Sequence, residues 1–292
     1  MAPITVTPEW LNSHLDEVVV VDGSWYMPHM KRNPKEEFLA SHIKTAVPLF
    51  LKPLGSPTAP LPHTVCEFEH FQKAVTAVGI TDQSRVVVYD GSEVGCFSAF
   101  RVWWLFRYIG FDNVSVLNGG LPVWTSLGLP VESGPVKPVP SPLSSFSGSV
   151  AHPEMVASIE EVRQFANKKG GRVTALADAR PPPRFHGSVP EPRPGILRGH
   201  VAGAKNMPRG KLLDKQGLKT DPSAAKAAWE SCGLDVTAPG LCCNCGSGVT
   251  SCVLIASACV ASGLPVEAFG LFDLSTHAWL NPEDAAINPT EL

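Results

Sequence analysis

The sequence predicts an α/β fold built from two tandem repeats, each a mostly parallel β-sheet flanked by helices. Its 292 residues are enough for about two domains. The two halves share a series of motifs in the same order, and a stretch rich in Pro, Ser and Gly separates them. We therefore expect a first domain at 1–132, an extended linker at 133–149 and a second domain at 150–292.

The repeated motifs are apolar runs that alternate with segments typical of helices. The first half contains VVVVD at 18–22, SHIKTAVPL at 41–49 and RVVVYDG at 85–91. The second half contains VTALADAR at 173–180, GHVAGAKNMP at 199–208 and GLCCNCGSG at 240–248. His42 precedes Asp90 by 48 residues and His200 precedes Cys245 by 45, so Asp90 and Cys245 occupy corresponding positions.

Continuous apolar runs are typical of parallel strands that are covered by helices on both faces. In such sheets, functional groups gather where a strand ends and the next helix begins. Residues 241–260 have this form, because a short apolar strand is followed by a glycine-bearing loop and then by an apolar helix. This junction is the place to look for chemistry.

The composition excludes several classes of protein. Twenty-four basic and 27 acidic residues give a net charge of -3, which predicts neither nucleic-acid nor membrane binding. The start, MAPITVTPEW, does not resemble a secretory signal, and the longest apolar stretch, 252–264, is too short to span a bilayer. We expect a cytoplasmic protein whose eight cysteines are reduced thiols.

Cys245 lies at the predicted strand-to-helix junction, where backbone N–H groups and the helix dipole favour a thiolate. Gly246 and Gly248 let the loop curl and direct successive N–H groups at one point, which forms a nest for a negative sulfur. Ser247 and Thr250 add hydroxyl donors. The pattern is typical of a nucleophile that holds an anionic intermediate.

Three other interpretations of Cys245 are weaker. The first is a buried, inert thiol, the usual fate of a reduced cysteine; we interpret Cys242 and Cys243 in the strand and Cys252 and Cys259 in the helix in this way, but not Cys245 in its glycine-bearing loop. A metal site is disfavoured, because adjacent strand residues face opposite sides and no second ligand pair occurs at zinc spacing. A cysteine phosphatase needs an arginine about six residues after the cysteine, where this chain has Ser251.

The loop CGSGVT (245–250), in the second of two repeats, resembles that of the 3-mercaptopyruvate sulfurtransferases of the tandem-domain rhodanese family. The resemblance extends over nearly the whole chain and includes DGSWYMP (22–28), VLNGGLPVW (116–124) and the segment 178–208. It implies two rhodanese-like domains, the first non-catalytic because Asp90 stands at the cysteine position. Thiosulfate sulfurtransferases are similar in fold but carry basic residues in this loop, and here there are none.

The resemblance also implies residues that bind the substrate. Arg184 and Arg193 match two arginines that clamp the substrate carboxylate, a task suited to the guanidinium fork. Without the resemblance, we would interpret both as surface arginines in structural ion pairs. Gly246, Gly248, Val249 and Thr250 complete the substrate-binding set. Glu191 lies between the arginines and could orient one of them, while Asp178 and Arg180 suggest an internal ion pair.

A Ser-His-Asp relay is implied as well, with Ser247 and His63 as the serine and histidine and Lys52 at the aspartate position. A lysine cannot stabilise imidazolium, so the relay is either dispensable or differently tuned here. His63 could equally cap a loop. The segment FDLSTHAW (272–279) departs from the family's YDGSW beside the active site.

The implied activity is transfer of sulfur from 3-mercaptopyruvate, through a Cys245 persulfide, to a thiol acceptor such as thioredoxin or a small thiol, or to cyanide, with release of pyruvate. No cofactor, metal, nucleic acid or membrane is expected to take part. Two alternatives remain: a thiosulfate sulfurtransferase, and a low-turnover persulfide carrier or sulfur-sensing module.

Overall fold

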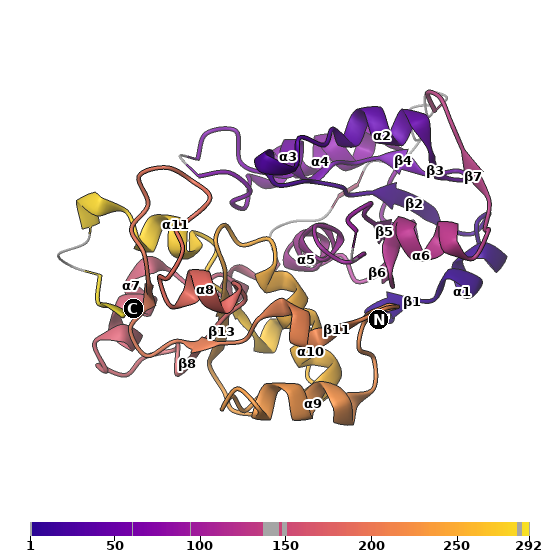
Figure 1. Ribbon diagram of the computed structural model, residues 1–292. Coiled ribbons are helices and arrows are strands. Elements are labelled where there is room, and N and C mark those ends of the chain that lie inside the picture. The colour runs from indigo at the N-terminus through magenta and orange to yellow at the C-terminus, as the bar shows by residue number, and fades with distance from the viewer. Residues whose placement is uncertain are drawn as a thin grey trace. The chain divides into compact units, whose positions relative to one another are not determined.

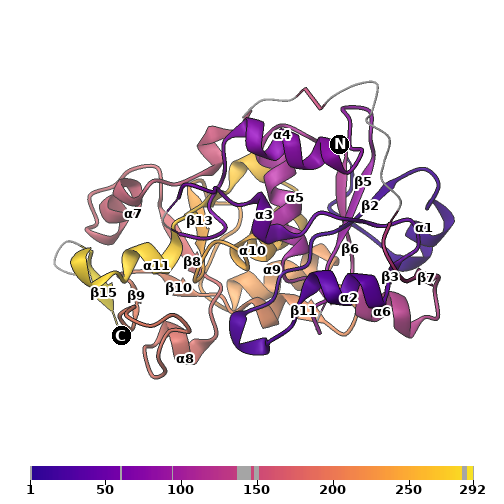
Figure 2. The same cartoon turned by 90° about the horizontal axis from the view of Figure 1, so that it is seen from above.

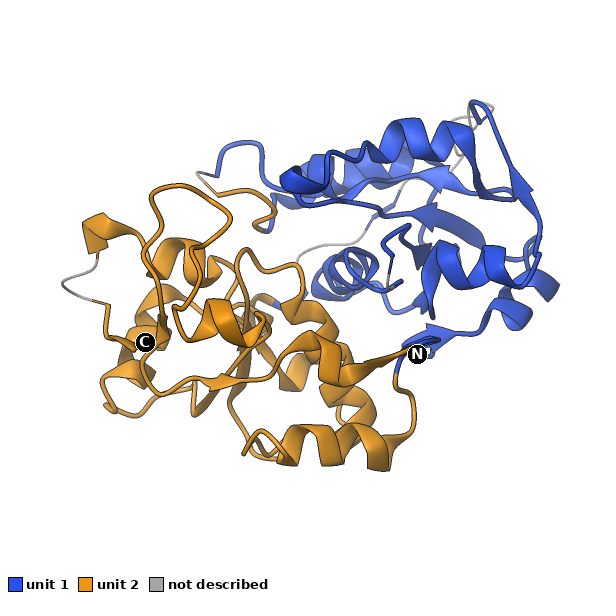
Figure 3. Ribbon diagram, in the orientation of Figure 1, with its two compact units in different colours: residues 1–59, 65–152, 215–218 blue, residues 60–64, 153–214, 219–292 orange. Residues whose placement is uncertain are grey.

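The computed structural model describes residues 2–59, 61–93, 95–136, 146–147, 151–284 and 288–291 (Figure 1). The chain forms two compact units (Figure 3). Unit 1 comprises Met1–Ala59, Val65–His152 and Lys215–Leu218, and unit 2 comprises Pro60–Thr64, Pro153–Asp214 and Lys219–Leu292. Each half of the chain therefore contributes one short segment to the unit formed mainly by the other half. Most of the predicted linker, 137–145 and 148–149, lies outside the described residues.

Two described parts of the chain near the unit boundaries pack within unit 1. Phe146, from the predicted linker, is buried against Phe71 and Phe111. Leu218 is held by the side chain of Asn118, which donates to its carbonyl at 3.0 Å and accepts from its N–H at 2.8 Å. These contacts explain why both segments cluster with unit 1.

Unit 1 is built on a five-stranded sheet in the order β1-β6-β5-β2-β4, and every neighbouring pair is parallel. A short antiparallel pair, β3 and β7, lies apart from this sheet. The strands are β1 (Thr5–Val6), β2 (Val19–Asp22), β3 (His42–Ile43), β4 (Val47–Pro48), β5 (Val86–Tyr89), β6 (Val114–Leu117), β7 (Val131–Glu132) and β12 (Gly217–Leu218). The helices are α1 (Pro8–Ser13), α2 (Pro34–Ala40), α3 (Leu51–Leu54), α4 (Phe68–Ala77), α5 (Ala99–Tyr108) and α6 (Gly120–Ser126), with a 3₁₀ turn η1 (Pro28–Met30).

The central strand β5 is buried along its whole length, as its uninterrupted VVVY sequence predicts for a strand covered on both faces. Helix α5 contacts β5 and β6 (Figure 2), and nearly all of its residues are buried. The parallel sheet and flanking helices confirm the predicted α/β class for this half.

Two buried carboxylates end neighbouring strands of this sheet. Asp22 ends β2, and Asp90 directly follows β5. Asp90 accepts hydrogen bonds from the backbone N–H groups of Ser92, Phe97 and Ala99, at 3.0, 2.6 and 2.9 Å. The loop after β5 is thus an N–H nest occupied by a carboxylate of the same chain.

Unit 2 repeats this plan with a four-stranded parallel sheet in the order β10-β8-β13-β14. The strands are β8 (Ala175–Asp178), β9 (His200–Val201), β10 (Lys205–Asn206), β11 (Leu213–Asp214), β13 (Leu241–Asn244), β14 (Gly270–Leu271) and β15 (Thr290–Glu291). The helices are α7 (Ile159–Ala166), α8 (Pro182–Phe185), α9 (Pro222–Glu230), α10 (Ser251–Ser262) and α11 (Ser275–Trp279), with 3₁₀ turns η2 (Pro153–Met155), η3 (Arg209–Leu212), η4 (Val266–Ala268) and η5 (Pro282–Asp284).

The predicted strand, loop and helix of the second half are confirmed as β13, residues 245–250 and α10 (Figure 1). Helix α10 is apolar on every side because it contacts β13 on one side and α9 on another. It ends at Gly263, whose φ of 71° is the left-handed conformation that glycine adopts most easily. No helix in the described part of the chain is long and apolar enough to cross a membrane.

Candidate active site

Cys245 follows β13 directly, and its side chain is buried with 3% of the residue exposed. Burial alone opposes ionisation of a thiol. Hydrogen bonds from the Thr250 hydroxyl and from the backbone N–H groups of Ser247 and Ser251 outweigh burial, and the pKa of Cys245 is lowered. The Ser251 hydroxyl also donates to Cys245 Sγ at 3.7 Å. The loop therefore favours a thiolate, which is the form that acts as a nucleophile.

The two glycines of the loop are required for different reasons. Gly248 has a φ of 77°, in the left-handed region that side chains with a Cβ rarely adopt. A Cβ at Gly246 would lie only 2.9 Å from Nη2 of Arg184. Gly248 thus allows the loop to turn, while Gly246 leaves room for a guanidinium next to the nucleophile.

The first residues of α11 fix the backbone of the nucleophile. Cys245 N–H donates to Ser275 Oγ at 3.2 Å, and Cys245 C=O accepts from Thr276 N–H at 3.1 Å and from Thr276 Oγ1 at 2.6 Å. His277 N–H donates to Gly246 C=O at 3.2 Å. We call Ser275–His277 the clamp. Ser275 adopts a φ of 55°, which is rare for a residue with a side chain and is typical of constrained functional segments.

A chain of buried charges leads from the sheet to this loop. Arg180 binds Asp178 at 2.7 Å, which confirms the predicted internal ion pair, and binds Glu191 at 2.9 Å. Arg184 Nε and Nη2 then donate to the two oxygens of Glu191, at 3.1 and 2.5 Å. Burial opposes the ionisation of Glu191, but Arg184 and Arg180 lower its pKa overall. Glu191 therefore orients Arg184, as its position between the arginines suggested.

Arg193 and His277 lie near this chain of charges without joining it. Neither side chain forms a hydrogen bond or ion pair within the part of the chain that the structure describes, and Nδ1 of His277 is fully buried. Burial lowers the pKa of Arg193. Burial and then the nearby charge of Arg193 lower the pKa of His277 to about 4, so its imidazole is neutral at physiological pH.

The structure brings together most of the predicted site, but not all of it. Cys245, Ser247, Thr250 and Arg184 meet around the loop, and Val249 is buried within it. His63 is buried and falls in the 60–64 segment of unit 2, with a φ of 66°. The relay role of His63, with Lys52 in place of an aspartate, stays a prediction.

Ser251 and the clamp were missed by sequence reasoning. The sequence marks Ser251 only as the position where a phosphatase would carry arginine, although a hydroxyl in the first turn of a helix can face a preceding thiolate. The clamp carried a weaker signal, namely the departure of FDLSTHAW from the family pattern. Its contacts with Cys245 span about 30 residues of sequence, which local patterns do not reveal.

Four other thiols in this half lie in the predicted strand and helix. Cys242 and Cys243 lie in β13, and Cys252 and Cys259 lie in α10. Burial raises the pKa of Cys242 to about 12, and it also raises that of Cys243. These two thiols are therefore protonated at physiological pH, and a thiol is a much weaker nucleophile than a thiolate. Within the described ranges, no group of three or more His, Cys, Asp or Glu side chains is arranged to hold a metal ion.

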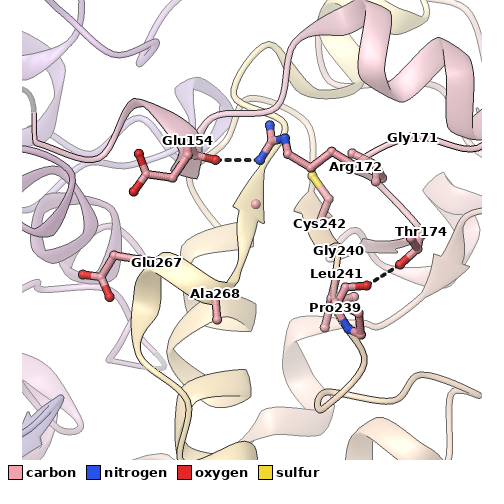
Figure 4. Close-up of a pocket in the computed structure, with 12 residues that line it drawn as sticks. Glu154, Gly171, Arg172, Thr174, Pro239, Gly240, Leu241, Cys242, Glu267 and Ala268 are labelled. Carbon is pink, nitrogen blue, oxygen red and sulfur yellow. Dashed lines mark hydrogen bonds between the residues drawn. The ribbon is translucent and has the colours of Figure 1, made fainter.

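A cavity of about 460 Å³ opens at the other end of β13 (Figure 4). Its lining includes Glu154, Arg172 and Cys242 but not Cys245. Arg172 is engaged there by Glu161 at 2.6 Å and by the Glu154 carbonyl at 2.6 Å. Because its lining includes no residue of the 245–250 loop and none of Arg184, Arg193 and His277, this cavity is separate from the active site.

Comparison with known proteins agrees with the fold. Residues 7–127, which lie in unit 1 apart from 60–64, match the family model described as a rhodanese-like domain. The 3-mercaptopyruvate sulfurtransferase of Rattus norvegicus is 35% identical over 249 residues, covering 85% of this chain and 81% of the rat protein. The thiosulfate sulfurtransferase of Bos taurus is 34% identical over 263 residues, covering 90% and 84%. The crystal structure of SseA from Escherichia coli, described as a 3-mercaptopyruvate sulfotransferase, superposes with a TM-score of 0.79 at 31% identity, covering 94% of this chain and 99% of SseA.

The tandem fold and the thiolate-stabilising loop define an enzyme of the rhodanese type, which transfers a sulfur group. Within that class, the chain belongs to the 3-mercaptopyruvate sulfurtransferase family. The predicted family, fold class and enzyme class are confirmed. As a sulfurtransferase, the protein acts on a sulfur donor and a sulfur acceptor.

Proposed function

We propose that the protein moves sulfur from 3-mercaptopyruvate to a thiol acceptor through a persulfide on Cys245. The observation that carries the proposal is the environment of Cys245, a buried thiol whose pKa is nevertheless lowered by hydrogen bonds from its own loop. A loop that stabilises a thiolate suits equally the negative outer sulfur of a persulfide, since both are anions in the same nest.

In the first step the Cys245 thiolate attacks the sulfur of mercaptopyruvate. A sulfur–sulfur bond forms, the carbon–sulfur bond breaks, and its electron pair passes to the carbon as the enolate of pyruvate. The proton of the donor's thiol ends on that carbon, so pyruvate and the Cys245 persulfide anion are the products. In the second step an acceptor thiolate attacks the outer sulfur and releases the Cys245 thiolate.

The charges around the loop favour a carboxylate donor. Three guanidiniums, those of Arg180, Arg184 and Arg193, face two carboxylates, Asp178 and Glu191, so the group retains a net positive charge. Arg184 reaches the space above Gly246, beside the nucleophile. A charge-assisted bond to a carboxylate contributes about 1.5–3 kcal/mol, or roughly one to two orders of magnitude in affinity.

The finer assignments belong to the same proposal. Thioredoxin or a small thiol is the proposed acceptor in the cell and cyanide a convenient acceptor in an assay. Ser247 and His63 are proposed to handle protons around the departing enolate. The net charge of -3 supports neither a nucleic acid nor an acidic membrane as a partner, and we propose a cytoplasmic location, where thiols stay reduced.

The test compares pyruvate release from mercaptopyruvate with sulfite release from thiosulfate, using cyanide as acceptor. We expect a higher specificity constant for mercaptopyruvate, one added sulfur atom in the intact mass after donor alone, and loss of both signals in Cys245→Ser. Cys232→Ser, a change at a half-buried thiol outside the site, is the control and should behave as the unmodified protein. Preference for thiosulfate would refute the donor assignment, and turnover by Cys245→Ser would refute the nucleophile.

A further inference from the structure

His277 reaches the space beside the nucleophile from a different element than Arg184 does. Its own N–H holds the Gly246 carbonyl, which brings the imidazole over the loop. A Cβ built on Gly246 would lie 2.9 Å from Arg184 Nη2 and 3.6 Å from His277 Nε2. A guanidinium and an imidazole thus converge on one point, next to the residue that follows Cys245.

The imidazole is buried and has no partner for its polar atoms. The residue is 8% exposed, and neither ring nitrogen forms a hydrogen bond with any residue that the structure describes. A buried N–H without an acceptor is more costly than a buried lone pair. The ring is therefore more stable with its proton on Nε2, the nitrogen that faces Gly246, than on the enclosed Nδ1. This tautomer presents an N–H donor to the shared point.

The surroundings keep this donor uncharged. Burial and the positive charge of Arg193 lower the pKa of His277 to about 4, Arg184 and Arg180 act in the same direction, and Glu191 opposes them. A neutral imidazole adds no positive charge to a site that already holds three guanidiniums. It can still donate one directed hydrogen bond to an oxygen that becomes negative during the reaction.

We infer that His277 donates a hydrogen bond from Nε2 to the 2-oxo oxygen of the sulfur donor and stabilises the enolate that forms there. The inference rests on the proposed function, because only an α-keto donor has such an oxygen. When Cys245 bonds to the donor sulfur, the electron pair of the carbon–sulfur bond is delocalised onto this oxygen. Arg184 binds the neighbouring carboxylate, so the carboxylate and the 2-oxo oxygen of one donor bind Arg184 and His277 respectively.

The experiment replaces the imidazole and compares two donors. His277→Phe keeps a planar ring but has no N–H, and His277→Gln carries an amide nitrogen at a reach similar to Nε2. We expect His277→Phe to lower kcat with mercaptopyruvate about 10²-fold, as for loss of one oxyanion donor.

Turnover of thiosulfate, whose leaving group is sulfite and not an enolate, should change far less. His277→Gln should recover part of the lost kcat. His186→Phe, at an exposed histidine of the same unit, is the control and should match the unmodified protein.

The outcomes separate this inference from the function on which it rests. Persulfide formation from thiosulfate by His277→Phe, seen by intact mass, shows that the Cys245 loop is intact. The unmodified protein could use mercaptopyruvate while His277→Phe loses activity equally with both donors, or loses it with neither. Either result refutes the role of His277 and leaves the proposed function standing. An unmodified protein that transfers sulfur from thiosulfate but not from mercaptopyruvate refutes the donor assignment itself.

Discussion

Asp90 and Cys245 occupy corresponding positions in the two units, and in both the side chain accepts hydrogen bonds from backbone N–H groups of the loop that follows it. In unit 1 the nest holds a carboxylate, which has no sulfur chemistry. In unit 2 it holds a thiol and adds the hydroxyls of Thr250 and Ser251. The residue at this position therefore decides whether the loop offers a thiol or a carboxylate, and in unit 2 the hydroxyls of the loop help to lower the pKa of that thiol.

Removing the Thr250 hydroxyl should move the activity to higher pH. The thiolate is the reactive form, so kcat/KM rises with pH through the pKa of Cys245, and Thr250→Val takes away the strongest of the bonds that lower this pKa. We expect the rising limb of the pH–rate profile to shift upward and the rate near pH 7 to fall by up to about tenfold. Thr250→Ser keeps a hydroxyl and should leave the profile nearly unchanged. A Thr250→Val profile identical to that of the unmodified protein would contradict this account.

At the scale of elements, the junction of β13 and α10 could be predicted because its signals are local. An apolar strand, two glycines and an apolar helix follow one another within about 20 residues. The same reasoning identified Asp178 and Arg180, which are two residues apart. It could not identify the clamp, because only the fold brings α11 beside the loop. His277 has no local pattern that marks it as part of the site.

Weakening the clamp should cost both stability and turnover. Thr276→Val keeps the shape of a fully buried side chain but removes the hydroxyl that donates to Cys245 C=O at 2.6 Å. We expect a loss of about 1–3 kcal/mol in the free energy of unfolding and a lower kcat, because the nucleophile is held less firmly. Denaturant unfolding and steady-state kinetics measure the two effects. Thr276→Ser retains the hydroxyl and is the matched control. Unchanged unfolding and kcat in Thr276→Val would show that the backbone N–H of Thr276 is sufficient.

At the scale of the whole molecule, the two units share a plan but differ in how they accommodate a buried acid. Asp178 and Asp22 end equivalent strands, and each accepts a backbone N–H two residues later at 2.9 Å. In unit 2 that later residue is Arg180, whose guanidinium binds Asp178. In unit 1 it is Ser24, which carries no charge. Burial, with the charge of Asp90 acting in the same direction, raises the pKa of Asp22 to about 7.

The contribution of Asp22 to the stability of unit 1 should therefore decrease as the pH rises. The folded state holds a proton on Asp22 up to about pH 7, while the unfolded chain releases it near its ordinary value of 3.8. The resulting stabilisation is complete below about pH 4 and is lost as the pH rises to about 7. The asparagine of Asp22→Asn cannot ionise, so this variant should be more stable than the unmodified protein at pH 8. We expect a higher unfolding temperature and a free energy of unfolding that is larger by up to roughly 4 kcal/mol. Thermal unfolding from pH 5 to pH 8 tests this, with Asp16→Asn, a change at an exposed carboxylate, as the control. A difference that does not grow with pH would contradict it.

The carboxylate in the loop of unit 1 also limits how many sulfur atoms one chain can carry for transfer. Asp90 fills its nest permanently, and a carboxylate can be neither persulfidated nor oxidised as a thiol can. Under the proposed function, a chain with two repeats carries one equivalent of transferable sulfur. A burst of pyruvate in the absence of acceptor then counts active molecules one for one, and the burst amplitude divided by the protein concentration is a direct measure of the fraction of intact Cys245.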